Sequence, residues 1–201
     1  MGSKDTYHHG ALRQALVTEA LDVLEKEGLE SLSLRRLAEA AGVSKTAPYR
    51  HFASKRDLLT SLAAEGFREF ADRLEKAAAA EPLAGVRALS RAYLDFARAR
   101  PALYRLMFSP LGYSLHSEAC RLNSERALSV LFRVVQRAQD AGWRAGQDGR
   151  SLALAVWAGV HGWASLLIDG LLPEGLLSGE ASWPVFVEAL FPPEDTPPAR
   201  P

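Results

Sequence analysis

Apolar residues recur at helical spacing along nearly all of this 201-residue chain. In the first such segment, about 10–26, Leu12, Leu16, Ala20 and Leu24 are four positions apart and share one helix face. The alternating β-branched runs bounded by turn residues that mark strands do not occur in the sequence. The chain is therefore predicted to be all-α, and its 48% hydrophobic residues are enough to build a core.

Residues that cap helices divide the sequence into further predicted helices. Ser33 is a good N-cap for a helix through Ala41, and Ser44 is a candidate cap for a short third helix over 45–51. Ser54 and Asp57 have capping-box spacing at the start of a long helix that ends before Pro82. The remaining predicted helices span 85–100, 101–108, 114–141, 149–171 with Asp148 as its cap, and 183–191.

The distribution of charge is more informative than its sum. Basic and acidic residues number 24 each, so the mean charge does not indicate a partner. Between Ser33 and Arg56, however, six basic residues stand against one acidic residue, Glu39. A local basic stretch on a neutral chain is typical of nucleic-acid binding, although an ordinary solvated helix face would carry the same charges.

A helix, a tight turn at Gly42 and a second helix form the plan of a helix-turn-helix. In that plan the second helix enters the major groove and its first residues meet base edges. Pro48 is tolerable there because the early amides of a helix have no intrahelical partner. Plain helical bundles share this geometry, so the types of residue on the second helix decide whether it could bind DNA. The candidate DNA contacts on this helix are Lys45, Thr46, Ala47, Tyr49, Arg50 and His51.

The stretch 33–59, SLRRLAEAAGVSKTAPYRHFASKRDLL, resembles the DNA-binding region of the TetR family of bacterial transcriptional regulators. The resemblance lies in the hydroxyl residue that opens the second helix, the alanines before Gly42-Val43-Ser44, and Tyr49 before His51-Phe52. The form Thr46-Ala47-Pro48-Tyr49 departs from the more frequent glycine-containing one and leaves the operator sequence open. The other expected DNA contacts are Ser33, Arg35, Ser44 and Lys55, the last at a helix start that attracts phosphate.

The segment 156–163, VWAGVHGW, resembles the Trp-His-Gly subtype of the family's C-terminal ligand-binding domain. The resemblance implies that helices over 149–171 and 182–191 pair with a second copy in a four-helix interface. A stripe of small residues at i, i+4 and i+7 agrees with close helix approach. The expected interface residues are Ala155, Gly159, Gly162, Phe186 and Leu190.

A small-molecule pocket is expected in the same C-terminal region, lined by aromatic side chains from several helices. Ligand pockets are mostly apolar with a few polar anchors, so the effector is expected to be largely apolar. Each lining residue taken singly would also suit plain core packing. The candidates are Tyr93, Phe96, Tyr104, Met107, Phe108, Tyr113, Phe132, Trp157 and His161.

These features predict a homodimeric, ligand-responsive repressor that binds a palindromic operator in duplex DNA. Its predicted domains are a three-helix helix-turn-helix domain over 8–56, a helical ligand-binding and dimerisation domain over 57–191, and a disordered tail over 192–201. The alternative is a DNA-binding regulator with a filled core and no effector. An enzyme would need a catalytic constellation, which the sequence does not offer.

No cofactor, metal set or catalytic residue is expected. The lone Cys120 and the neighbouring His116 make at most a weak metal pair. The uncharged stretch 152–168 is shorter than the roughly 20 apolar residues of a spanning helix, so we expect a buried helix and no membrane association. One cysteine and no secretory signal fit a cytoplasmic protein.

Overall fold

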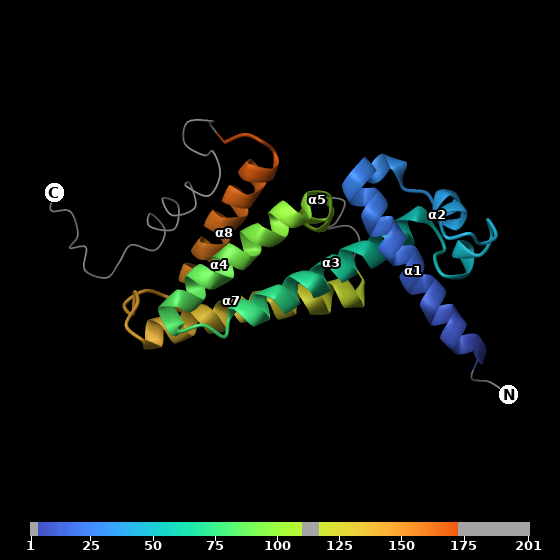
Figure 1. Cartoon of the computed structure of the whole chain (residues 1–201). Coiled ribbons are helices and arrows are strands. Elements are labelled where there is room, and N and C mark those ends of the chain that lie inside the picture. The colour runs from blue at the N-terminus through green and yellow to red at the C-terminus, as the bar shows by residue number, and fades with distance from the viewer. Residues whose placement is uncertain (1–3, 110–116, 173–201) are drawn as a thin grey trace. The chain divides into compact units, whose positions relative to one another are not determined.

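The computed structural model describes residues 4–109 and 117–172, and over these residues the chain is helical with no strand. This confirms the all-α prediction. The helices, drawn in Figure 1, are α1 (Lys4–Glu27), η1 (Leu29–Ser31), α2 (Leu34–Ala40), η2 (Pro48–Arg50), α3 (Lys55–Ala77), α4 (Pro82–Ala99), α5 (Pro101–Phe108), α7 (Glu118–Asp140) and α8 (Gly149–Ile168).

The chain divides into two compact units. The first unit comprises Met1–Glu69 and Arg100–Ser124, and the second comprises Phe70–Ala99 and Glu125–Pro201. The helix α5 therefore belongs to the same unit as the predicted DNA-binding helices, although it follows them by some 45 residues in the sequence.

The core of the first unit forms where the helical spacing predicts it. Leu16, Ala20 and Leu24 of α1 are buried, as are Leu37 of α2 and Phe52 after η2. The helix α1 begins at Lys4 rather than near residue 10. A glycine inside a helix costs only about 1 kcal/mol relative to alanine, so Gly10 does not stop α1 from extending toward the N-terminus.

In the second unit, α4 packs along α8 (Figure 1). Leu152, Val156, Val160 and Ala164 form the buried face of α8 at helical spacing. By length and composition alone, α8 could cross a membrane, a test that the core helix of a soluble protein also passes. Its packing against α4 accounts for one side of its apolar surface.

The predicted caps of α2 and α8 are confirmed, and the cap of α3 is confirmed with one shift. Asp148 accepts a hydrogen bond from the Ser151 N–H at 2.8 Å and begins α8. The Ser54 hydroxyl oxygen accepts from the Asp57 N–H at 3.2 Å, while the Asp57 carboxylate accepts from Ala53 N–H rather than from Ser54. The capping box therefore closes one residue earlier than its usual form.

Further helix ends differ from the predictions, and α4 begins at Pro82 instead of 85. The helix α8 ends at Ile168 instead of 171 because Gly170 has a φ of 66° and the Leu171 N–H turns back to the Leu166 carbonyl oxygen. The helix α7 begins at Glu118, and part of the predicted start at 114 lies outside the described residues. The predicted helix 183–191 and the tail 192–201 also lie outside them.

Candidate nucleic-acid interface

The turn after α2 has the hydrogen bonds of a Schellman motif. Gly42 adopts a φ of 65°, its N–H donates to the Glu39 carbonyl oxygen, and the Val43 N–H donates to the Ala38 carbonyl oxygen at 3.0 Å. At the other end of α2 the Ser33 hydroxyl oxygen accepts from the Arg36 N–H. Both ends of α2 are therefore fixed by local bonds, which sets the direction of the chain that follows.

The chain that follows is not the α-helix predicted over 45–51. Residues 44–51, here named the reader segment, form a turn and then the 3-10 helix η2. Pro48 has no N–H and cannot donate to the Ser44 carbonyl, so the α-helical pattern does not start there. The bonds from Ala47 N–H to the Ser44 oxygen and from Arg50 N–H to the Ala47 oxygen span three residues instead.

Ser44 does not cap a helix through its side chain. Its hydroxyl lies 3.2 Å from the Thr46 hydroxyl, so the two side chains hold the turn together. The prediction of Ser44 as the cap of a third helix is therefore wrong, for the same reason that the helix itself is absent.

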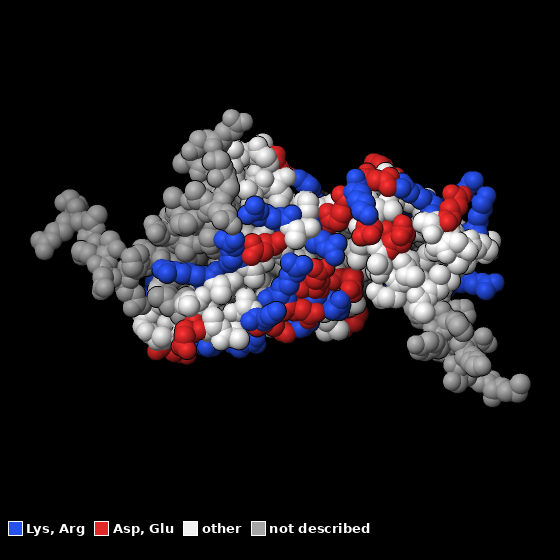
Figure 2. Space-filling view, in the orientation of Figure 1, with Lys and Arg blue, Asp and Glu red and all other residues white. Residues whose placement is uncertain are grey.

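The reader segment presents its polar side chains to solvent. Lys45, Thr46 and Arg50 are exposed, and the aromatic ring of Tyr49 has an exposed fraction of 57%. The buried Pro48 holds this segment against the unit. Figure 2 shows Lys and Arg side chains on the surface around α2, with acidic side chains among them. Ser44 is also exposed, and Ala47 and His51 are half-buried.

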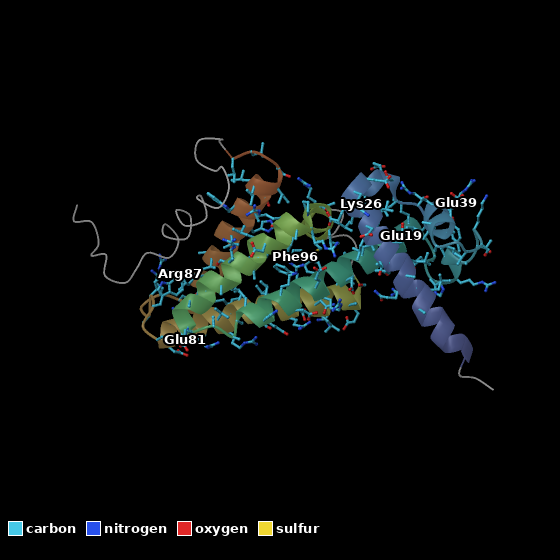
Figure 3. All side chains as sticks on the ribbon, in the orientation of Figure 1. Glu19, Lys26, Glu39, Glu81, Arg87 and Phe96 are labelled. Carbon is cyan, nitrogen blue, oxygen red and sulfur yellow. The ribbon has the colours of Figure 1, made fainter. Side chains whose placement is uncertain are left out.

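Three further predicted DNA contacts have bonds within the chain. Ser33 is the cap of α2, and Arg35 pairs with Glu39 one turn later, which Figure 3 labels on α2. The Lys55 ammonium donates to the Leu29 carbonyl oxygen at 3.0 Å and so ties α3 to η1. Lys55 thus supports the fold of this unit, and its predicted contact with DNA stays a prediction.

Sequence reasoning missed the contacts that support the reader segment from α1. The Arg13 guanidinium lies 5.3 Å from the centre of the buried Phe52 ring and donates to the Ser61 hydroxyl. A bidentate pair between Arg36 and Glu27 joins α2 to α1, and this hydrogen bonding lowers the pKa of Glu27. These partners are far apart in sequence, so no local pattern points to them.

The predicted effector residues fall into two groups. Tyr93 and Phe96 of α4 are buried in the second unit and flank the Phe70 ring. Figure 3 labels Phe96. Trp157 and His161 of α8 belong to the same unit. Tyr104, Met107 and Phe108 of α5, with Tyr104 and Met107 buried, belong to the first unit.

Two predicted effector residues stand apart from these groups. Phe132 of α7 is half-buried and has the Arg150 guanidinium over its ring. Tyr113 lies outside the described residues. His116 of the suggested pair with Cys120 also lies outside them, and the Cys120 thiol donates to the Thr60 carbonyl oxygen at 3.5 Å.

One polar contact links the aromatic side chains of the second unit. The Tyr93 hydroxyl and the His161 Nδ1 are 2.8 Å apart and join α4 to α8. Burial lowers the pKa of His161 and so favours its neutral imidazole. A neutral imidazole and a phenol in an aromatic setting can orient a ligand without requiring that it carry a charge.

The predicted interface residues on α8 lie away from its most buried face. Ala155 is exposed, and Gly159 and Gly162 are half-buried. A methyl group added at Gly162 would meet no atom within 4 Å. Phe186 and Leu190 lie outside the described residues.

An α-helix with fixed ends, a tight glycine turn and an exposed basic segment with a short 3-10 helix follow the plan of a helix-turn-helix. Residues 16–62 match the family described as "Bacterial regulatory proteins, tetR family", and residues 86–190 match "Tetracyclin repressor-like, C-terminal domain". The chain belongs to the TetR family of bacterial transcriptional regulators. Its assignment to the Trp-His-Gly subtype stays a prediction.

Curated relatives cover different parts of the chain. The tetracycline repressor protein class C of Escherichia coli is 49% identical over 51 residues, which are 25% of this chain and 23% of that protein. An uncharacterized HTH-type transcriptional regulator of Mycobacterium tuberculosis is 27% identical over 177 residues, 85% of this chain and 69% of that protein. The match to the class C repressor therefore spans less than a quarter of that repressor's length.

Solved structures extend the similarity over the whole fold. A protein of unknown function from Rhodococcus sp. RHA1 has a TM-score of 0.76 and 34% identity, covering 92% of this chain and 94% of that one. AibR, solved with isovaleryl coenzyme A and operator DNA, has a TM-score of 0.68 and 21% identity, covering 90% and 99%. At that identity the likeness to AibR shows the fold alone.

Proposed function

We propose that this protein is a repressor that binds a palindromic operator as a homodimer and leaves it when a small molecule binds. The observation that carries the proposal is the exposure of Lys45, Tyr49 and Arg50 on the segment that follows the Gly42 turn. Lys45 and Arg50 can neutralise phosphates or donate to guanine, and Tyr49 combines a flat apolar face with a hydrogen-bond donor. Membership of a family of transcriptional regulators supports the same conclusion.

A second copy of the chain is the proposed partner of α8. Leu154, Ala155, Ala158 and Leu166 form an exposed apolar strip on this helix. The visible surface of α8 in Figure 2 is largely uncharged. A two-fold dimer matches a palindromic operator, whose half-sites are expected about 34–36 Å apart or at a multiple of that spacing.

The proposed effector is a largely apolar molecule with a polar group that reaches Tyr93 and His161. Their hydrogen bond lies among aromatic rings, which favours an apolar body and a neutral polar head. Uncharged compounds with an apolar body and one hydroxyl or carbonyl group are therefore a reasonable first panel. The cytoplasm is the proposed compartment, since the operator is there.

The second candidate function is a regulator that needs no effector. The ring contacts among Phe70, Tyr93 and Phe96 favour it, because these side chains pack against one another in the second unit. A thermal-shift screen separates the two candidates. Saturating ligand at 100 times its Kd stabilises a protein by about 2.7 kcal/mol, which raises the melting temperature by several degrees.

The main proposal is tested by selecting a duplex from a random pool and then comparing Lys45→Ala with Lys76→Ala. Both variants remove one exposed lysine, but Lys76 is at the end of α3 in the second unit. Loss of a phosphate contact at Lys45 should weaken binding and reduce the slope of log K against log salt by about one. Lys76→Ala should leave both quantities unchanged, and equal behaviour of the two variants would contradict the assignment.

Tyr49→Ala tests the reader segment in a second way. The ring is largely exposed, so its removal should change the free energy of unfolding by no more than about 0.5 kcal/mol. Operator binding should nevertheless weaken while the dimer persists. Lys55→Ala should also weaken binding, but it is a less clean probe because Lys55 bonds to the Leu29 carbonyl.

A further inference from the structure

The first turn of α5 is capped by a side chain from a different helix. Ala102 and Leu103 have N–H groups that no carbonyl within α5 can reach. The Glu25 carboxylate of α1 accepts both, with Oε2 bonded to Ala102 and Oε1 to Leu103, each at 3.1 Å. Pro101 has no N–H to satisfy, and within the described chain the N-cap residue Arg100 forms no side-chain cap. The start of α5 therefore depends on the position of α1.

Apolar contacts seat α5 on α3 as well. A Cβ atom at Gly66 would lie 2.6 Å from the Met107 sulfur and 3.0 Å from Leu103 Cδ1, so any larger residue would force the Met107 side chain to shift. The rings of Phe67 and Phe108 meet edge to face with centroids 5.5 Å apart. The Arg100 guanidinium adds a 3.7 Å ion pair to Glu69 of α3. All of these residues belong to the first unit.

The helix α5 is too short to be stable without contacts to the rest of the chain. It comprises eight residues, whereas isolated helices shorter than about 12–15 residues are marginal in water. Its order therefore comes from the contacts to α1 and α3. Loss of either set of contacts would therefore favour local opening of α5.

The helix α5 lies in the same unit as the reader segment. It carries Tyr104 and Phe108, two of the predicted effector residues. It also contacts α1, whose Leu16 and Leu24 form the core that supports α2. Lys26, labelled in Figure 3, is next to Glu25 in the chain and marks the end of α1 that packs on α5.

We propose that the Glu25 carboxylate couples the order of α5 to DNA binding by holding the first turn of α5 in the DNA-binding state. This inference rests on the proposed function and names the residue through which regulation passes. Glu25 is a positioning residue, because its bonds go to Ala102 and Leu103 rather than to DNA or ligand. Coupling of this kind is reciprocal, so DNA binding must in turn favour the seated state of α5.

The test is residue-resolved hydrogen exchange of the full dimer, with and without the duplex recovered in the selection above. In the wild type, the Ala102 and Leu103 amides should exchange more slowly when the duplex is bound, by a factor within the roughly 5–150-fold range of typical coupling. Because the readout uses DNA as the second ligand, the effector need not be known. Equal exchange rates in the presence and absence of bound duplex would overturn the proposal.

Glu25→Ala and Glu25→Gln are the informative variants, and Asp22→Asn is the matched control. Asp22 is one turn earlier on α1, is exposed and pairs with Lys26, so its substitution removes the same charge without touching α5. Both Glu25 variants should reduce the duplex-dependent change in exchange to less than about twofold and weaken duplex binding by the lost coupling factor. Asp22→Asn should retain the full change.

The glutamine variant keeps the size of the side chain and guards against a general loss of folding in the alanine variant. A purely structural role for Glu25 would lower the stability of the protein but leave the duplex-dependent protection of α5 intact, and that result would overturn the proposal. Absence of any duplex binding by the wild type would contradict the proposed function itself. Normal duplex binding with uncoupled α5 amides would contradict only the role of Glu25.

Discussion

The reader segment and the outer face of α8 are both exposed, but they expose opposite chemistry. The reader segment presents Lys45 and Arg50 around the ring of Tyr49. The outer face of α8 presents Leu154 and Leu166, whose exposed fractions are 44% and 43%. Long apolar side chains in such a strip favour a protein partner, whereas cations beside an aromatic ring favour a polyanion.

The comparison also shows how differently the two surfaces are supported. The reader segment has its supports within the chain, through the Schellman turn at Gly42 and the buried Phe52. The inner face of α8 packs on α4, but the described chain does not cover its outer face. One surface is thus complete in a single copy, while the other is completed by a second copy in our account.

The largest expected effect is on the support of the reader segment. Phe52 has an exposed fraction of 1%, and its ring carries the Arg13 guanidinium. Phe52→Ala should lower the free energy of unfolding by about 3–5 kcal/mol, because it removes a buried ring and leaves a cavity. Chemical denaturation measures this loss. A loss below about 1 kcal/mol would show that the segment is not held from within its own unit.

A charge on α8 should break the other surface. Gly159→Asp places a carboxylate in the middle of the proposed helix pairing, where an unpaired buried charge is strongly unfavourable. The dimer should dissociate at least about a hundredfold more readily, which corresponds to roughly 2.7 kcal/mol. Light scattering with sizing measures the association. A variant that remains dimeric at the same concentrations would place the interface elsewhere.

Gly42→Ala should have an intermediate effect. The φ of 65° at Gly42 is a left-handed conformation that costs a residue with a Cβ about 1–2 kcal/mol. Gly146→Ala is the control, because Gly146 has no positive φ and an added methyl group meets no atom within 4 Å. Thermal unfolding of the two variants compares them directly. Equal stabilities would mean that the turn does not constrain the reader segment.

A smaller effect should appear in the pH dependence of stability through His161. Burial lowers the folded-state pKa of this residue from its ordinary 6.5, so the folded state binds fewer protons than the unfolded one. Stability should therefore fall as the pH is lowered from above 6.5 toward the folded-state pKa. Denaturation series in this window should show a shallower slope for His161→Gln. An unchanged slope would mean that the environment of His161 does not contribute to the pH dependence of the free energy of unfolding.

The smallest effect should come from the exposed pair of Glu27 and Arg36. Hydrogen bonding to Arg36 lowers the pKa of Glu27 below 4.5, so the contribution is present above pH 4.5 and is lost as the pH falls through the folded-state pKa. Glu27→Gln should remove this part of the acid sensitivity. Because the pair is solvated, the change should be small, and 0.5 M salt should reduce it further. A salt-independent difference would argue against an electrostatic origin.

Local signals predicted much of the fold and the position of the interface. Ser33 and Asp148 act as caps as predicted, because a cap depends on residues only three positions apart. The prediction of a third α-helix over 45–51 was wrong. Pro48 is allowed in the first turn of an α-helix as well as in a 3-10 turn, so its presence does not decide between them. Composition alone does not choose between these two outcomes.

Contacts between distant residues account for what the sequence did not reveal. Arg13 stacks on Phe52 and Glu25 caps α5 across 77 and 78 residues, and no periodicity connects such partners. The sequence pattern did not show which of the aromatic residues proposed for the effector lie in the same unit. The structure separates Tyr104 of the first unit from Tyr93 of the second, because periodicity gives the face of a helix but not its neighbour.

The most direct test of the central claim compares two duplexes of equal length and base composition, one carrying the selected palindrome and the other scrambled. At a fixed salt concentration near 150 mM, the purified dimer should bind the palindrome at least about a thousandfold more tightly, as specific DNA-binding proteins do. Equal affinities for the two duplexes would show that the reader segment senses only charge and would contradict the account.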